Sequence, residues 1–235
     1  MACAALVHVG PARQSFWALH RRDGGGMRER TRLLPRAREL RLETGTLLLR
    51  DCGVELKLEL SEDAGFEAFC PNGRQYVWTR KQAGVLARGT LAIDGGPAQP
   101  IEARAVIDDT AGYHSRDTEW WWSAGVGSSP DGVALAWNLV SGVNDPERGS
   151  ERAVWVDGAP HEVEPVRFDG DLRRVDPADG SPLLFHAEAE RSHSENLLVF
   201  KSDYRAPFGT FSGALPGGIA LAQGLGVMEH HRARW

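Results

Sequence analysis

A glutamate and a histidine lie two positions apart near the C-terminus, in the segment Gly226-Val-Met-Glu-His-His-Arg-Ala-Arg-Trp235. If this segment is a β-strand, its side chains alternate between two faces, so Glu229 and His231 share a face with Val227 and Ala233. A carboxyl group and an imidazole beneath apolar neighbours shift each other's pKa, which is the equipment of general acid–base catalysis. A hydrogen bond that only stabilises the fold explains the same pair and is the commoner arrangement.

The second unusual segment is Gly112-Tyr-His-Ser-Arg-Asp-Thr-Glu-Trp-Trp-Trp122. Alternation places Arg116, Trp120 and Trp122 on one face, where aromatic walls and one cation suit a ligand pocket. Core tryptophans, with the arginine paired to an acid, explain the pattern equally well. The catalytic candidates are therefore Glu229, His231, His114 and Asp109, and the ligand-binding candidates are Tyr113, Arg116, Trp120, Trp122, Asn138 and Asn144.

The sequence contains no clear motif for a metal site or a nucleotide site. His114, Glu229 and His231 have the residue types of a two-histidine, one-carboxylate metal site, but no close ligand pair such as His-x-x-x-His accompanies them. The chain has no Gly-x-x-x-x-Gly-Lys phosphate loop, no Gly-x-Gly-x-x-Gly turn and no Gly-x-Ser-x-Gly nucleophile turn. We expect neither a metal nor a cofactor.

The elements that hold these side chains are predicted to be strands, because apolar residues recur with a period of two and turn residues recur about every 8–12 positions. No stretch predicts a helix, since Pro35 interrupts the one candidate at 28–43. Turns are expected at 51–53, 71–73 and 94–97. The expected strands cover 46–50, 54–60, 65–69, 75–79, 86–93, 102–107, 118–125, 132–140, 152–156, 162–168, 183–188, 197–201, 210–215 and 218–234.

The strand pattern also indicates a division of the chain. Residues 1–107 and 108–235 contain similar numbers of expected strands and meet at the segment 108–112. Such spacing is typical of β-sandwiches and β-barrels. We therefore expect an all-β fold with two barrel-like halves packed together.

Composition is that of a globular protein, since 42% of the 235 residues are hydrophobic, 25% are charged and the net charge is −5. Residues 13–41 carry nine arginines against three acids, which is compatible with a surface for nucleic acid or an anionic membrane. Glycine, proline and acids interrupt these arginines, so a solvated edge without a nucleic-acid partner is favoured. The weakly charged stretch 120–144 contains Asp131 and turn residues, so no membrane-spanning helix is expected.

The three cysteines, Cys3, Cys52 and Cys70, fit no zinc spacing, and a chain of this size needs no disulfide. Reduced thiols favour a cytoplasmic location. Residues 1–9 lack the basic start and the full apolar stretch of a signal peptide. The sequence leaves the oligomeric state open.

Seven segments resemble the bacterial domain of unknown function 2804 family and follow one another through nearly the whole chain. They are Ser15–Ala18, Tyr76–Lys81, Gly112–Trp122, Asn138–Gly142, Val154–Gly158, Pro207–Gly213 and Gly226–Trp235. The resemblance implies a lipocalin-like antiparallel barrel architecture, and no established catalytic residue comes with it. Members often carry a longer N-terminal segment, which implies that the first half is truncated at its start or that Met1 is a mis-called start.

The wider lipocalin-like group, to which the resemblance is more distant, includes carotenoid hydratases, AttH-type proteins and related cyclases or dehydratases. Two functions follow by analogy of fold. The first is binding of a hydrophobic small molecule in a β-barrel pocket. The alternative is an enzyme in which Glu229 or Asp109 protonates a double bond, His231 or His114 relays the proton, and tryptophans steady a cation. An interaction protein that uses the arginine-rich stretch is a third, minor possibility.

Overall fold

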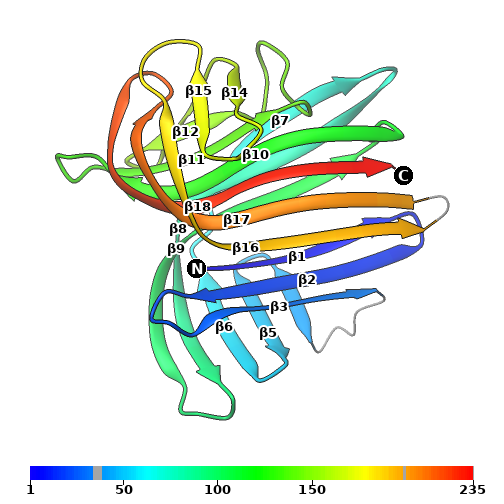
Figure 1. Cartoon of the computed structure of the whole chain (residues 1–235), viewed down its shortest axis with the longest axis vertical. Helices are drawn as coiled ribbons and strands as arrows, with labels where there is room; N and C mark the ends of the chain where they lie inside the picture. The colour runs from blue at the N-terminus through cyan, green and yellow to red at the C-terminus, as the bar shows by residue number, and fades with distance from the viewer. Residues whose placement is uncertain (34–38, 198–199, 235) are drawn as a thin grey trace. The chain divides into compact units, whose positions relative to one another are not determined.

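The computed structural model describes residues 1–33, 39–197 and 200–234. In these ranges the chain forms strands joined by turns and irregular segments, and no helix occurs (Figure 1). Accordingly, none of the described residues belongs to a helix that could cross a membrane. The predicted all-β fold is confirmed. The cytoplasmic location stays a prediction.

The chain divides into two compact units, which interleave along the sequence. Unit 1 comprises Met1–Asp63 and Val85–Ala105, and unit 2 comprises Ala64–Gly84 and Val106–Trp235. The expected joining segment 108–112 lies inside a strand rather than between two elements. The division into barrel-like halves at 1–107 and 108–235 stays a prediction.

Unit 1 contains a three-stranded antiparallel sheet in the order β1-β2-β3. Its strands are β1 (Ala2–Val9), β2 (Ala12–Arg21) and β3 (Gly26–Leu33). Trp17 and Leu19 of β2 are buried and form an apolar core with Leu49, Val54 and Leu56 of the same unit.

The second sheet has six strands, in the order β4-β5-β6-β8-β7 with β9 beside β8. Its strands are β4 (Leu40–Glu43), β5 (Thr46–Asp51), β6 (Val54–Leu60), β7 (Phe66–Asn72), β8 (Gln75–Ile93) and β9 (Gln99–Gly112). The prediction of separate strands at 75–79 and 86–93 is wrong, because β8 is continuous. Gly84 adopts a φ of 76° within β8, a conformation that glycine reaches without steric cost, so the strand changes course without ending.

Unit 2 contains a nine-stranded antiparallel sheet in the order β13-β12-β11-β10-β18-β17-β16-β15-β14. Its buried core includes Trp137, Leu139, Phe211 and Met228. The strands are β10 (Asp117–Ser128), β11 (Ala134–Ser141), β12 (Ala153–Val156), β13 (Ala159–Glu162), β14 (Val166–Phe168), β15 (Arg174–Pro177), β16 (Leu183–Leu197), β17 (Phe200–Leu215) and β18 (Ile219–Arg234).

Local turn chemistry fixes two of the hairpins. Cys52 and Gly53 have φ angles of 48° and 76°, and Asp157 and Gly158 have 49° and 82°. Two consecutive positive φ angles match the right-handed twist of the flanking strands, and a glycine at the second position favours them. The turn expected at 51–53 is therefore confirmed, and it joins β5 to β6.

Most of the expected strands are confirmed, with differences at their ends. The stretch 162–168 is not one strand, because β13 ends at Glu162 and β14 begins at Val166. The expected turn at 71–73 is shorter than predicted, since β7 continues to Asn72. Pro35 and Trp235, which entered the predictions for helix and C-terminal strand, lie outside the described residues, as does part of the stretch 197–201.

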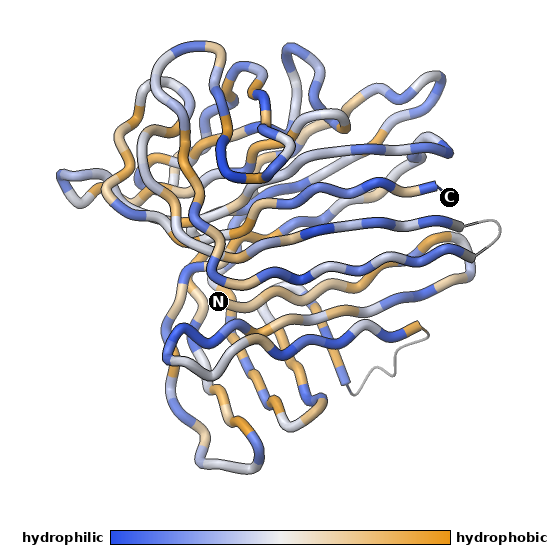
Figure 2. Tube along the Cα trace, in the orientation of Figure 1, coloured by the Kyte–Doolittle hydropathy of each residue, from blue (hydrophilic) through white to orange (hydrophobic). Residues whose placement is uncertain are grey.

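The pairing of β10 with β18 positions the candidate site. Trp120 lies opposite His231 and Trp122 lies opposite Glu229, so all four side chains share one face of the sheet. Polar and apolar residues alternate along such strands, as the colours of the trace show (Figure 2). The opposite face carries Met228, which is fully buried in the core of unit 2.

Candidate functional site

Glu229 and His231 meet at the indole of Trp120. The indole Nε1 of Trp120 donates a hydrogen bond to Oε1 of Glu229 at 2.9 Å. The same indole packs against the imidazole of His231, with ring centroids 4.2 Å apart. One tryptophan therefore contacts both the carboxyl group and the imidazole. These contacts are possible because the three side chains lie on the same face of the paired strands β10 and β18.

Burial changes the pKa of both groups in opposite directions. Loss of water around Glu229 raises its pKa from 4.5 to about 7, although the Trp120 hydrogen bond acts in the other direction. Loss of water around His231 lowers its pKa from 6.5 to about 4, with smaller contributions from His230 and Arg191. Near neutral pH, Glu229 is therefore poised to give up a proton while His231 is a neutral imidazole.

Both side chains are recessed but not sealed. Glu229, His231, Trp120 and Trp122 are each only partly buried. Desolvation is nevertheless the largest influence on the pKa of Glu229, which means that protein surrounds the carboxyl group on most sides. A desolvated carboxyl group in a residue that is only partly buried has an environment suited to a general acid.

Strand β17 completes the surroundings of His231. Ser202 Oγ lies 2.8 Å from Nε2 of His231, and the Tyr204 ring lies 5.5 Å from the imidazole. The guanidinium of Arg191 lies over the Tyr204 ring at 4.6 Å from its centroid, within the range of a cation–π contact. Ser202 thus fixes the orientation of the imidazole.

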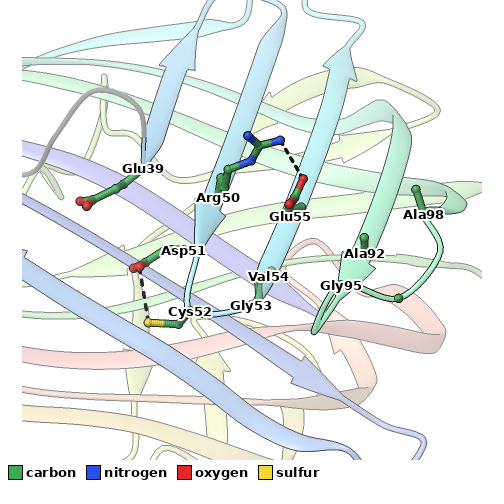
Figure 3. A pocket seen from close by; sticks show the side chains of 11 residues that line it. Glu39, Arg50, Asp51, Cys52, Gly53, Val54, Glu55, Ala92, Gly95 and Ala98 are labelled. Atoms are coloured by element: carbon green, nitrogen blue, oxygen red, sulfur yellow. Dashed lines mark hydrogen bonds and ion pairs between the residues drawn. The ribbon is translucent and has the colours of Figure 1, made fainter.

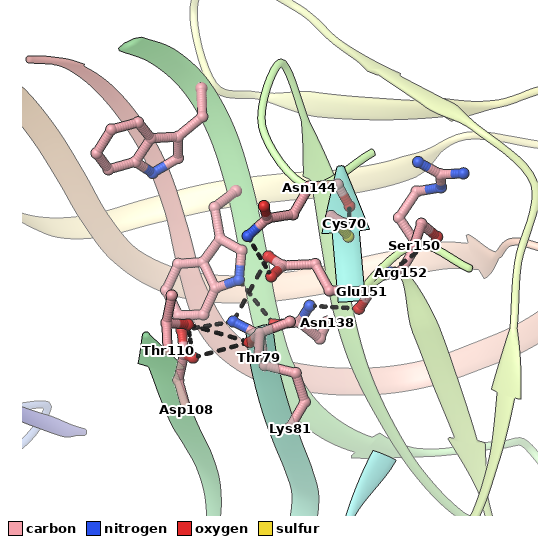
Figure 4. Close-up of polar contacts among 12 residues, drawn as sticks. Cys70, Thr79, Lys81, Asp108, Thr110, Asn138, Asn144, Ser150, Glu151 and Arg152 are labelled. Atoms are coloured by element: carbon pink, nitrogen blue, oxygen red, sulfur yellow. Dashed lines mark hydrogen bonds and ion pairs between the residues drawn. The ribbon is translucent and has the colours of Figure 1, made fainter. Parts of the chain in front are cut away.

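A second polar cluster in the same unit is built on a buried lysine (Figure 4). Lys81 is 2% exposed, and its Nζ lies 2.5 Å from Oδ2 of Asp108 and 3.5 Å from Oε1 of Glu151. Oδ1 of Asp108 accepts a hydrogen bond from the Thr110 hydroxyl at 2.8 Å, and Thr79 Oγ1 lies 3.0 Å from that hydroxyl. Burial alone would lower the pKa of Lys81, but the charges of Asp108 and Glu151 raise it above its ordinary value, so Lys81 is an ammonium.

The two polar groups are joined through Trp122 and Asn138. Trp122, the cross-strand neighbour of Glu229, donates from Nε1 to Oδ1 of Asn138 at 2.8 Å. The amide of Asn138, which is fully buried, donates to the backbone carbonyl of Glu151 at 2.8 Å. Asn144 donates from Nδ2 to Oε2 of Glu151 at 3.0 Å. Asn138 and Asn144 thus belong to a hydrogen-bond network that reaches Trp122, and their assignment to a ligand site stays a prediction.

Four predicted site residues are not brought to Glu229. Tyr113, His114 and Arg116 are exposed and precede β10. Asp109 forms an ion pair with Arg80 at 2.6 Å, on the face of β9 opposite to that of Asp108. Their assignment to a site stays a prediction. The described part of the chain also contains no group of three side chains arranged to hold a metal ion.

Three residues of the network were missed by sequence analysis, namely Lys81, Asp108 and Glu151. Lys81 is one of only three lysines in a chain with 24 arginines. It alternates with Val77 and Thr79 on β8, and these residues are all buried. The sequence offered one indication of this site, namely that the charged Lys81 falls on the same strand face as Val77 and Thr79. The acids that neutralise it come from distant segments, which no local pattern can show.

The arginine-rich stretch forms ion pairs within unit 1. Arg28 pairs with Asp94 at 2.6 Å, and Arg32 pairs with Asp51 at 2.6 Å. The same unit contains an open groove of about 740 Å³, lined in part by Arg50, Asp51 and Cys52 (Figure 3). Its lining includes none of the predicted site residues.

Comparison with known proteins agrees with this architecture. The model of the family described as "Domain of unknown function (DUF2804)" matches residues 27–235. Among solved structures, kievitone hydratase from Nectria haematococca is similar, with a TM-score of 0.58 and 11% identity over 97% of this chain and 82% of that one. A putative AttH from Nitrosomonas europaea gives a TM-score of 0.53 and 13% identity, over 95% of this chain and 82% of that one. No curated protein matches the sequence.

Proposed function

The chain belongs to the DUF2804 family, and we propose that it binds a hydrophobic small molecule against the face of unit 2 that carries Trp120 and Trp122. The support is that both tryptophans remain partly exposed while their indole N–H groups are bound to partners within the protein, so the exposed part of each residue can contact a ligand. Aromatic surface with a few placed polar groups is typical of small-molecule sites.

Acid–base catalysis at this site is the second candidate function, and Glu229 favours it. Its carboxyl group is recessed, bonded to Trp120 and has a pKa of about 7. A carboxylic acid of this kind can protonate a carbon–carbon double bond, and the two indoles can stabilise the resulting carbocation. The fold shared with a kievitone hydratase supports the addition or removal of water as the reaction class, by analogy.

Native mass spectrometry of the protein purified from its own host tests the binding function. We expect a hydrophobic compound that is retained in the native spectrum and released on denaturation. A protein that is empty after growth under several conditions, and that binds no compound from an organic extract of the host cells, would contradict the proposal.

Incubation of the purified protein with the organic extract separates the two functions. An enzyme converts one component into a product that differs by one water, and Glu229→Gln abolishes this conversion. Glu190→Gln is the matched control, because Glu190 is an exposed carboxylate paired with Arg205 at 2.8 Å in the same unit. Retention of a compound without any conversion would leave binding as the function.

A further inference from the structure

The face of unit 2 that carries Trp120 continues onto strand β17 with Tyr204. Tyr204 lies opposite His231 in the pairing of β17 with β18, and Trp120 lies opposite the same histidine in the pairing of β10 with β18. The ring centroids of Tyr204 and His231 are 5.5 Å apart, and those of Trp120 and His231 are 4.2 Å apart. The three rings therefore form one row across three strands, and each of these residues is only partly buried.

The hydroxyl group of Tyr204 is buried without a hydrogen bond. Its Oη is almost inaccessible to water, and none of the described residues forms a hydrogen bond with it. The other two tyrosines of the chain, Tyr76 and Tyr113, are 54% and 59% exposed, so their side chains lie largely in water. A buried tyrosine hydroxyl usually has a partner, because leaving it unsatisfied costs the free energy of its desolvation.

The histidines on either side of Tyr204 hold other partners. Nε2 of His231 lies 2.8 Å from Oγ of Ser202. His193 lies opposite Tyr204 on β16, and its Nε2 lies 2.8 Å from Oε1 of Glu195. These two nitrogens are therefore engaged, and the Tyr204 hydroxyl is left to a group from outside the chain.

The guanidinium of Arg191 determines which kind of group fits. It lies over the Tyr204 ring, 4.6 Å from the ring centroid, and Arg191 is 2% exposed. A cation held this close, away from bulk water, polarises the phenol and makes its hydroxyl a stronger donor. The complementary group is thus a hydrogen-bond acceptor, such as the oxygen of a ketone, an ether or an ester.

A ligand that lies on Trp120 can extend to Tyr204. Two steps between neighbouring strands separate these residues, so a molecule about 10 Å long spans both. Two fused rings with a short substituent have this length. Because the hydroxyl is enclosed, side chains around it change rotamer as the ligand arrives, which is common at binding sites.

We propose that Tyr204 selects the ligand of this site, because its hydroxyl donates a hydrogen bond to an acceptor oxygen of a hydrophobic molecule whose rings lie on Trp120. This inference rests on the proposed binding function and narrows the ligand class to compounds that carry a ketone, ether or ester oxygen. Pure hydrocarbons leave the hydroxyl unsatisfied. A site that forms a hydrogen bond with one group of its ligand rejects analogues that lack the group.

Equilibrium dialysis with two naphthalenes of similar shape tests the assignment. 2-Acetylnaphthalene carries a ketone oxygen, and 2-isopropylnaphthalene has a methyl group in its place. In Tyr204→Phe, which removes only the hydroxyl, we expect the affinity for the ketone relative to the hydrocarbon to fall about tenfold. Tyr76→Phe is the matched control, because it removes an exposed tyrosine hydroxyl of the same unit and should keep the wild-type ratio.

The stability of the same variant separates a ligand role from a structural one. A hydroxyl without a partner costs free energy in the folded protein, so Tyr204→Phe should be at least as stable as the wild type in urea unfolding. Both proteins are refolded from urea beforehand, so that they carry no compound from the host. A variant that is clearly less stable would mean that the hydroxyl bonds to a protein group, and the proposal would be overturned.

The outcomes distinguish this proposal from the function on which it rests. Binding of both naphthalenes with the same affinity ratio in the wild type and in Tyr204→Phe would overturn the role of Tyr204 and keep the hydrophobic site. Binding of neither compound by the wild type would contradict the proposed binding function itself. A ratio that falls in Tyr204→Phe but not in Tyr76→Phe, with undiminished stability, supports a ligand that carries an acceptor oxygen.

Discussion

Two ion pairs, one in each unit, differ in how far they are removed from water. In unit 1 an open groove is lined in part by Arg50 and Glu55, which pair at 2.9 Å and remain 69% and 49% exposed. In unit 2 the charged residues Lys81 and Glu151 are 2% and 5% exposed. Water screens the first pair, so its charges change little on folding, whereas burial changes the proton affinity of the groups in unit 2. The proposed chemistry is therefore placed at the desolvated titratable groups of unit 2.

The largest expected effect concerns the buried lysine. Lys81→Met leaves Glu151 without its cation, and removing one partner of a buried pair typically costs about 3–5 kcal/mol of unfolding free energy. Urea unfolding followed by tryptophan fluorescence measures this loss. If Lys81→Met were as stable as the wild-type protein, the claim that the buried charges of unit 2 depend on each other would be contradicted.

Stability against pH should reveal opposing contributions from Glu229 and His231. The pKa of Glu229 is raised from 4.5 to about 7, so between these values the folded state keeps a proton that the unfolded state releases, and stability falls as pH rises. The pKa of His231 is lowered from 6.5 to about 4, so between these values only the unfolded state is protonated, and stability rises with pH. The two effects oppose each other between pH 4.5 and 6.5.

Single variants should separate these contributions. Over this range, the stability of Glu229→Gln relative to the wild type should rise with pH, and that of His231→Asn should fall. Each slope approaches about 1.4 kcal/mol per pH unit, the value for one proton. Urea unfolding at several pH values measures the slopes, and parallel profiles for all three proteins would contradict the assigned shifts.

A smaller effect is expected on ligand affinity. Trp120→Ala removes an aromatic wall and the donor to Glu229, so binding of the hydrophobic dye anilinonaphthalene sulfonate should weaken about tenfold. Tyr76→Ala is the control, because Tyr76 is a 54% exposed aromatic residue of the same unit. Equal affinities for the two variants, measured by fluorescence titration, would place the dye elsewhere.

The smallest effect is expected at an ion pair of unit 1. Arg88 and Glu102 lie 2.8 Å apart and are 64% and 61% exposed. Glu102→Gln should leave the urea midpoint unchanged, because solvent screens exposed pairs and ordering two long side chains offsets their attraction. A clear shift in the midpoint would remove the distinction between the two units.

The fold could be predicted further than the site. Local alternation defined β6 because one face of this strand is more buried than the other, and Cys52–Gly53 marked a turn that needs positive φ angles. Alternation predicted that Glu229 and His231 share a face of one strand, and separately that Trp120 and Trp122 share a face of another. That these two faces coincide depends on the pairing of β10 with β18, which alternation does not predict. The ion pairs of Lys81 could not be predicted, because Asp108 and Glu151 reach it from positions 27 and 70 residues further along the chain.

The ionisation of Glu229 is the measurement that tests this account most directly. With glutamate labelled by ¹³C at its carboxyl carbon, an NMR titration follows each glutamate, and the spectrum of Glu229→Gln assigns the signal. The structure predicts a midpoint of about 7 for Glu229. A midpoint near 4.5, the value of an ordinary glutamate, would mean that water reaches the carboxyl group freely, and the acid role of Glu229 would be contradicted.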